Sequence, residues 1–366
     1  MVGTAGAGKL FGMASLPALQ TVRAPKAVVV TFGGGARDAE TFAPEGQANI
    51  PNMLRDLIPQ ATFYTQVINH GILGHYVATA SLATGVYESF NNFAAVQPQN
   101  PTVFEYMRRD LKRAADDAWV VAPSNGFGGI GESNHRLYGT GLGARVILPK
   151  HLLAAAMRSG GGAAGFSEHL LRDNYETPLF DPSPTGSMSQ EDLHRTAELL
   201  DVSVSDFRAH ATTLSSPDEL SFYIARQLMR RVAPSLLWIT LHDIDIAHSG
   251  AFSLYLDGIR RSDRLCAEIW RTIQSEPEYK DRTTMYVLPD FGRDADEDAG
   301  GNGFQHHRTG DPLSRTTWML VLGPGVRQNT VIDRPVDSLD LVPTLAQRLG
   351  FQARFAQGKP LAEVLA

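Results

Sequence analysis

Short apolar runs rich in β-branched residues alternate with amphipathic segments from residue 26 onward. This alternation is typical of an α/β domain, with a mostly parallel central sheet and helices on both faces. The apolar runs that predict strands are 26–32, 62–68, 118–124, 235–241, 283–289 and 317–323. The segments that predict helices are 49–59, 76–85, 103–115, 217–232, 252–274 and 338–350.

The regular alternation is interrupted between residues 126 and 220. Gly, Pro and Ser cluster at 159–165 and 181–190 around short helical stretches. Such clusters mark loops, so we expect a loop-rich insertion or cap over the sheet edge. The predicted organisation is one α/β domain over 26–366, with its insertion at about 126–220.

The first 25 residues form a different kind of segment, small, apolar and poor in acidic residues. They are either the remnant of an export signal or an apolar N-terminal arm that binds a partner. The first alternative predicts a bacterial protein that is periplasmic or exported, while a cytoplasmic location stays open. No window approaches the roughly 20 apolar residues that a transmembrane helix needs.

The composition limits the classes of partner that we expect for this chain. The 366 residues are 43% hydrophobic and 20% charged, which suits a folded chain with a large core, and the formal net charge is -6. No long block of basic residues is present, which argues against nucleic acid or an anionic membrane as the main partner. Cys266 is the only cysteine, so the chain alone cannot form a disulfide or a zinc–thiolate cluster.

Polar clusters follow several of the predicted strands, most densely in "LLWITLHDIDIAHSG" at 236–250. Ligands of open α/β sheets bind just beyond the carboxyl ends of the strands. Asp245 and His248 offer an oxygen and an imidazole nitrogen on one tight turn, and His306 or His307 would complete a set suited to zinc, iron or manganese. The alternative is that these histidines cap helices or satisfy buried carbonyl groups.

The order of the strand ends resembles that of the alkaline phosphatase superfamily, which includes phosphatases, sulfatases and nucleotide pyrophosphatases. The resemblance spans roughly residues 26–352. The motifs that carry it are "AVVVTFGGGARD", "ATASLATGVY", "ITLHDIDIAHSG", "TTMYVLPDFGRD", "FQHHRTGD" and "DSLDLVPTLAQRLGF". The "GGG…DAETF" stretch is also similar to a divergent exported branch with Gly-Gly at this strand end.

The resemblance implies two metal ions that clamp a phosphoryl or sulfuryl group while a Ser or Thr attacks. If the ligands of the superfamily are carried over to this sequence, Asp245, His248 and His307 would bind the first ion. His306 is an alternative to His307. We also expect His242 and Asp243 to orient these ligands.

The chain departs from the superfamily pattern at the second ion. The aspartate of the first strand is replaced by glycine within Gly33–Gly35, and Asp290 is followed by Phe291 where the pattern has histidine. The nucleophile position falls on or near His75. Asp38, or Glu40 beside it, could supply the missing carboxylate if the glycine-rich loop bends back.

Two functions follow from these residues. The first is a metal-dependent hydrolase of small phosphate or sulfate esters, with reduced or lost activity, in which His75 or water attacks. The second is a catalytically silent scaffold that binds protein partners through the N-terminal arm and the 126–220 region.

Overall fold

The computed structural model describes residues 23–92, 96–138, 141–159, 170–171, 189–297 and 300–364. The expectation for the apolar N-terminal segment therefore lies outside the described residues, except for its last positions. Part of the expected insertion, at 139–140, 160–169 and 172–188, lies outside them as well.

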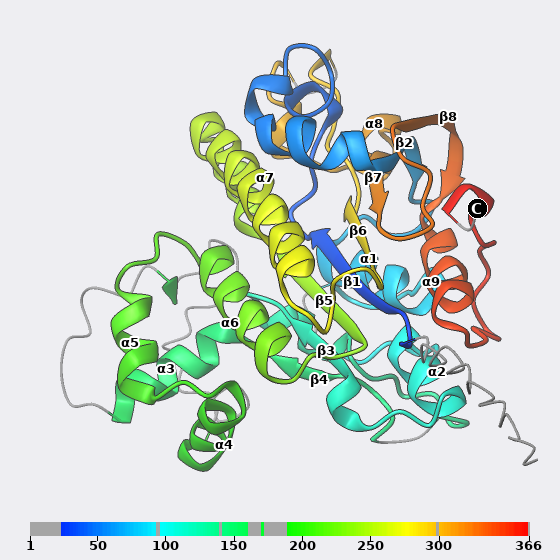
Figure 1. The fold of residues 1–366 in the computed structure, drawn as a ribbon. Coiled ribbons are helices and arrows are strands. Elements are labelled where there is room, and N and C mark those ends of the chain that lie inside the picture. Colours follow the sequence, from blue (N-terminus) through cyan, green and yellow to red (C-terminus); the bar gives the residue numbers. More distant parts are fainter. Residues whose placement is uncertain are drawn as a thin grey trace, which may run out of the picture.

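Within these ranges, eight strands form one sheet in the order β4-β3-β5-β1-β6-β7-β2-β8 (Figure 1). Neighbouring strands are parallel except where β7 pairs with β6 and β2, so β7 alone runs against the rest. The strands are β1 (Lys26–Phe32), β2 (Ala61–Ile68), β3 (Ala118–Val121), β4 (Arg145–Ile147), β5 (Leu236–Leu241), β6 (Thr283–Pro289), β7 (Thr316–Leu322) and β8 (Thr330–Asp337). The mostly parallel α/β sheet expected from the sequence is thus confirmed.

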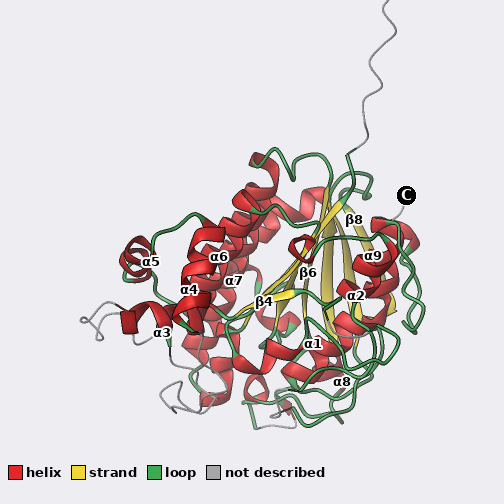
Figure 2. Cartoon of the chain, turned by 90° about the horizontal axis from the view of Figure 1, so that it is seen from below, coloured by secondary structure: helices red, strands yellow, loops and turns green. Residues whose placement is uncertain are grey.

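Helices cover both faces of the sheet (Figure 2). Val28, Val30 and Phe32 of β1 belong to one apolar core, and the alternate residues Ala27 and Val29 belong to the other. This period of two is what a strand buried on both faces requires. The first core lies under α6 (Pro217–Arg231) and α7 (Phe252–Ser275), and the second under α1 (His75–Thr84), α2 (Val103–Asp110) and α9 (Leu341–Leu349).

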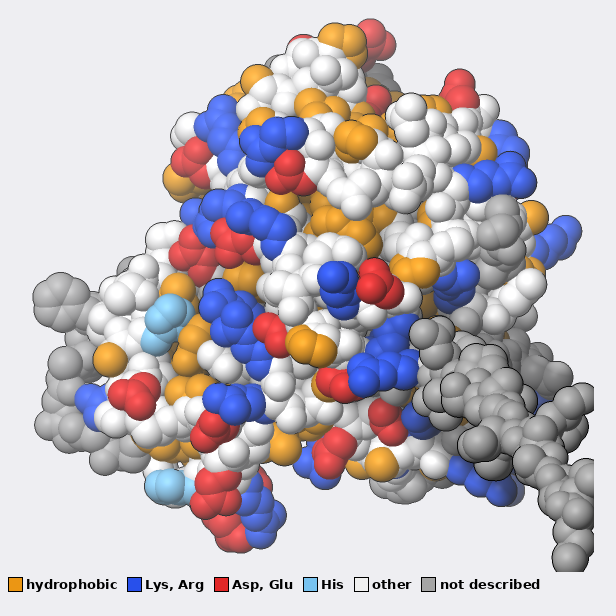
Figure 3. All heavy atoms as spheres, in the orientation of Figure 1, with side chains coloured by type: hydrophobic (Ala, Val, Ile, Leu, Met, Phe, Trp, Pro, Cys, Tyr) orange, Lys and Arg blue, Asp and Glu red, His pale blue; other side chains and the backbone are white. Residues whose placement is uncertain are grey.

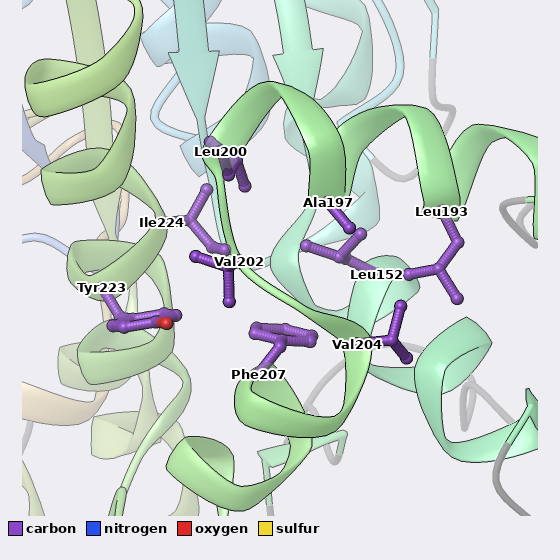
Figure 4. A pocket seen from close by; sticks show the side chains of 9 residues that line it. All are labelled: Leu152, Leu193, Ala197, Leu200, Val202, Val204, Phe207, Tyr223 and Ile224. Carbon is purple, nitrogen blue, oxygen red and sulfur yellow. The ribbon is translucent and has the colours of Figure 1, made fainter.

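The region expected to be loop-rich contributes β4 and three helices, α3 (Pro149–Ser159), α4 (Gln190–Leu200) and α5 (Val204–Ala211). These helices pack on α6 around a small apolar hollow (Figure 4). The Gly, Pro and Ser clusters concealed this packing because they dominate the local pattern. The hollow is lined by Leu152, Leu193, Ala197, Leu200, Val202, Val204, Phe207, Tyr223 and Ile224.

Strand β8 and the short helix α8 were not predicted, and one predicted helix differs in type. Strand β8 lies at the sheet edge and is half exposed, so its polar sequence "TVIDRPVD" has no apolar run. The segment expected as a short helix at 49–59 contains a π-helical turn, Met53–Leu57, flanked by 3-10 turns. The short helix α8 (Pro312–Arg315) leads into β7.

The surface agrees with the mixed charge of the sequence. On the face drawn in Figure 3, acidic side chains lie beside Lys and Arg side chains at several places. No helix among the described residues is both long and apolar enough to cross a bilayer.

The glycine turn after β1, residues Gly33–Gly35, lies in close contact with the turn that follows β5. A Cβ atom on Gly34 would lie 2.5 Å from the backbone nitrogen of Asp245, far inside van der Waals contact. Gly35 has a φ of 64°, a conformation that favours glycine. The turn can therefore approach the end of β5 only because it lacks side chains.

Gly34→Ala is expected to destabilise the protein by roughly 1–3 kcal/mol, because the added methyl group meets backbone rather than a movable side chain. Chemical denaturation of the variant measures this loss. Gly310→Ala is the matched control, since a Cβ atom there would meet nothing within 4 Å. Equal stability of the two variants would contradict the close approach.

Lys26 opens β1 with a buried ammonium group. Its Nζ donates to the carbonyl oxygens of Pro234, at 3.1 Å, and Ala233, and lies 5.1 Å from the ring centre of Tyr279. Burial, with a smaller contribution from the Arg282 charge, lowers the pKa of Lys26 to about 8 from the ordinary value of 10.5. Folding therefore favours the neutral amine between these two pH values.

This pKa difference makes stability depend on pH. Between pH 8 and 10.5 the unfolded chain binds more protons at Lys26 than the folded chain, so the contribution of Lys26 to stability rises with pH. The full change is on the order of 3 kcal/mol. The unfolding free energy of wild type minus that of Lys26→Met should increase across this range. A difference that stays constant with pH would contradict the lowered pKa.

Candidate metal centre

Loops at the carboxyl edge of the sheet supply the candidate site. The glycine turn follows β1, the 3-10 turn Asp243–Ser249 follows β5, and Asp290–Arg293 follows β6. Because β2 runs in the same direction as β1, the start of α1 lies at this edge too. Strands β1, β5 and β6 are buried along their whole length, which fixes the positions of the residues that follow them.

Four side chains converge at this edge: His75, Asp245, His248 and His307. One possible ligand atom from each lies within 4.8 Å of the others. Asp245 Oδ1 is 2.9 Å from His75 Nε2 and 3.3 Å from His248 Nε2, and the Nε2 atoms of His248 and His307 are 2.9 Å apart. Together they offer one carboxylate oxygen and three imidazole nitrogens around a common point.

His75 bridges two buried carboxylates. Its Nδ1 lies 2.7 Å from Asp290 Oδ2, and its Nε2 faces Asp245. Burial alone would lower the pKa of His75, but the two carboxylates outweigh it and raise the pKa to about 9. The ring stacks on Phe291 at 4.6 Å between centroids. The imidazole is therefore held on its face, by the hydrogen bond at Nδ1 and by the ion-pair contact at Nε2.

Arg293 is a second cation at Asp245, and it was not found from the sequence. Its Nη2 lies 2.8 Å from Asp245 Oδ1, and its side chain is fully buried. Burial would raise the pKa of Asp245, but His75 and His242 hold it well below its usual value. Asp245 is therefore an ionised carboxylate. The only signal in the sequence was an arginine three residues after Asp290, in a segment otherwise typical of a strand end.

His248 and His307 are neutral imidazoles. Burial, followed by the charge of Arg293, lowers the pKa of His248 to about 3. Burial and the nearby charge of His75 lower the pKa of His307 to about 2. His306, the expected competitor, has an exposed side chain and is not one of the converging residues. The geometry therefore favours His307 of the two.

The remaining predicted ligands are placed differently. Asp290 is fully buried and contacts His75, but it does not belong to the four-residue cluster. Burial raises its pKa, although His75 opposes this effect. Asp38 is exposed in the turn after β1, and Glu40 is engaged by Arg37. The glycine-rich loop therefore does not bend back to bring either carboxylate to the converging residues.

A second layer of side chains holds the turn after β5. His242 Nε2 lies 3.4 Å from Asp245 Oδ2, as expected of an orienting residue. Asp243 instead points to Arg261, at 2.8 Å. Asp218, at the start of α6, accepts hydrogen bonds from the backbone N–H groups of His242 (2.7 Å) and Asp243 (2.9 Å). Sequence reasoning missed Asp218 because an acidic residue in the first turn of a helix needs no further explanation.

Comparison with known proteins was informative only at the level of structure. No family model matches the sequence. No curated protein matches it either. Many solved structures match the fold.

Three of these structures illustrate the match. An alkaline phosphatase superfamily protein from Vibrio parahaemolyticus has a TM-score of 0.52 and 13% identity, over 94% of this chain and 71% of that one. Wild-type alkaline phosphatase PafA has a TM-score of 0.55 and 12% identity, over 94% and 100%. A phosphonate monoester hydrolase from Silicibacter pomeroyi has a TM-score of 0.52 and 13% identity, over 93% and 76%. At such identities the likeness concerns the fold, and the chain has the fold of the alkaline phosphatase superfamily.

Proposed function

We propose that this protein binds one divalent metal ion through Asp245, His248 and His307 and hydrolyses phosphate or sulfate esters. The observation that carries the proposal is the convergence of these side chains, from two loops about 60 residues apart, on one point at the carboxyl edge of the sheet. Two solved structures with this fold are, by their descriptions, an alkaline phosphatase and a phosphonate monoester hydrolase. They support the proposed class of substrate.

The donor set fits a metal ion chemically. An ionised carboxylate and neutral imidazoles are the protonation states that bind metal, and Asp245, His248 and His307 are held in those states. One oxygen and two nitrogens suit zinc, iron or manganese. A bound ion would supply a Lewis acid that polarises an ester oxygen.

His75 acts in this proposal by orientation rather than by attack. A nucleophilic imidazole needs a nitrogen lone pair, but both ring nitrogens of His75 face carboxylates, and its raised pKa of about 9 keeps it protonated near neutral pH. His75 would then hold Asp245 and Asp290 in place. Water remains as the attacking group.

The second candidate is a catalytically silent scaffold. The observation that favours it is the pairing of the two buried carboxylates, Asp245 and Asp290, with the cations Arg293 and His75. This pairing satisfies the carboxylates without any ion. The region 126–220 would then serve as a surface for a protein partner, as would the N-terminal arm, whose residues 1–22 are not described.

Metal content tests the proposed site. Protein purified without chelators or an affinity metal column should carry about one equivalent of zinc, iron or manganese by elemental mass spectrometry. Asp245→Ala and His248→Ala should lose it, with affinity falling by more than the ~10–100-fold typical of residues outside the coordination sphere. His306→Ala is the control and should keep the ion, because that side chain is exposed. Equal loss in all three variants would contradict the assigned ligands.

Hydrolysis and labelling separate the two functions and the two attacking groups. With metal bound, wild type should hydrolyse p-nitrophenyl phosphate or p-nitrophenyl sulfate, and His248→Ala should not. Because His75 lacks a free lone pair, no phosphohistidine should form when the enzyme turns over a labelled phosphate ester and is quenched in alkali. Label that disappears in His75→Ala would identify His75 as the nucleophile. Metal binding without hydrolysis of any ester would favour the scaffold.

A further inference from the structure

Arg293 is bound from three sides at the edge of the candidate site. Nε donates to the carbonyl oxygen of Gly34 at 3.0 Å, Nη1 donates to the carbonyl oxygen of Phe304 at 3.1 Å, and Nη2 contacts Asp245 Oδ1 at 2.8 Å. The guanidinium carbon Cζ lies over the Tyr255 ring, 5.8 Å from its centre. The charge is thus fixed in position by the ends of β1, β5 and β6 and by the 303–305 turn.

The surroundings of Asp290 are filled by side chains. His75 occupies the space between Asp290 and Asp245, and Phe291 packs on the His75 ring. A carboxylate cannot be restored on the β1 turn without movement. A Cβ atom on Gly33 would lie 2.7 Å from side-chain atoms of Phe127 and Thr240, and one on Gly34 would meet the backbone of Asp245.

We propose that Arg293 is a built-in cation that, together with His75 at Asp290, supplies the positive charge that a second metal ion would bring, so that the site holds one divalent ion and not two. This inference rests on the proposed function, because it assumes that the first ion binds at Asp245, His248 and His307. An arginine is never deprotonated in a protein, so its charge is permanent. Asp245 Oδ1 therefore has a permanent positive neighbour whether or not an ion is bound.

The position of the guanidinium has two consequences for metal binding. It is a second cation, beside His75, at the buried carboxylate of Asp245, which stabilises the empty site. It also repels any divalent ion that uses the same carboxylate, and this repulsion is strong because the group is fully buried. Arg293 should therefore weaken binding of the first ion while it excludes a second.

The number of ions bound by wild type is the first test. Apo protein titrated with zinc alone, in a calorimeter and by equilibrium dialysis, should bind one equivalent with saturation. Two equivalents bound to wild type would overturn the inference and leave the proposed function standing. No binding at all would overturn the proposed function, and the inference with it.

Replacement of the charge is the second test. Arg293→Met keeps much of the length but removes the charge, and should bind zinc at least tenfold more tightly or take up a second equivalent. Arg293→Lys keeps the charge and should stay at one equivalent with an affinity closer to wild type. A purely structural role would lower the melting temperature of both apo variants without tightening zinc binding in Arg293→Met.

A folded Arg293→Met protein, verified by circular dichroism, that binds zinc with unchanged or weaker affinity and at one equivalent would therefore refute the inference. Its apo form should be less stable than wild type, because the carbonyl groups of Gly34 and Phe304 lose their donor. Zinc should raise its melting temperature more than that of wild type. If Arg293→Met does not fold, the number of zinc ions bound by wild type still tests the inference: one ion supports it and two ions refute it.

Discussion

The carboxylate of Asp245, buried among cations and imidazoles, is the constraint on which the rest of the site depends. An ionised group removed from water must be paired and hydrogen-bonded, or it is strongly destabilising. Here the partners come from separate segments: His75 from the start of α1, His248 from the same turn, and Arg293 from the loop after β6. The interactions of the Asp245 carboxylate therefore hold together loops that are distant in the sequence.

Rigid segments next to Asp245 hold it in the position where this pairing can form. β5 is buried along its whole length, so the turn that follows it has a fixed origin. Asp218 fixes the first two backbone N–H groups of that turn, and the glycines after β1 allow the chain to pass within contact of Asp245. The site is consequently built from close backbone packing as much as from its polar side chains.

The same pairing explains why both a metal-dependent hydrolase and a silent scaffold are candidate functions. With Arg293 and His75 in place, the two buried carboxylates of the site are already balanced, and the fold does not need an ion to hold them. His248 and His307 are less easily explained without one, because two neutral imidazole nitrogens that face each other can share at most one hydrogen bond. We regard this histidine pair as the feature that a bound ion accounts for best.

The fold class could be predicted from the sequence, because apolar runs of strand length and amphipathic helices are local patterns. The polar cluster after Leu241 could be located for the same reason, since a buried strand that ends abruptly marks the carboxyl edge of a sheet. The edge strands β8 and β4 escaped prediction, as did the packing of the short helices of the 126–220 region on α6, because partial burial and Gly, Pro and Ser clusters leave a weak pattern.

Only the tertiary structure determined which charged side chains come into contact. No local pattern separates His307 from His306, since one faces the cluster and its neighbour faces water through the path of a single loop. Nor could the sequence show that Asp38 stays at the surface while Arg293, some 250 residues away, reaches the turn after β1. Residue types and their order determine the sheet, but pairing across the sheet edge depends on distances that arise only when the strands are assembled.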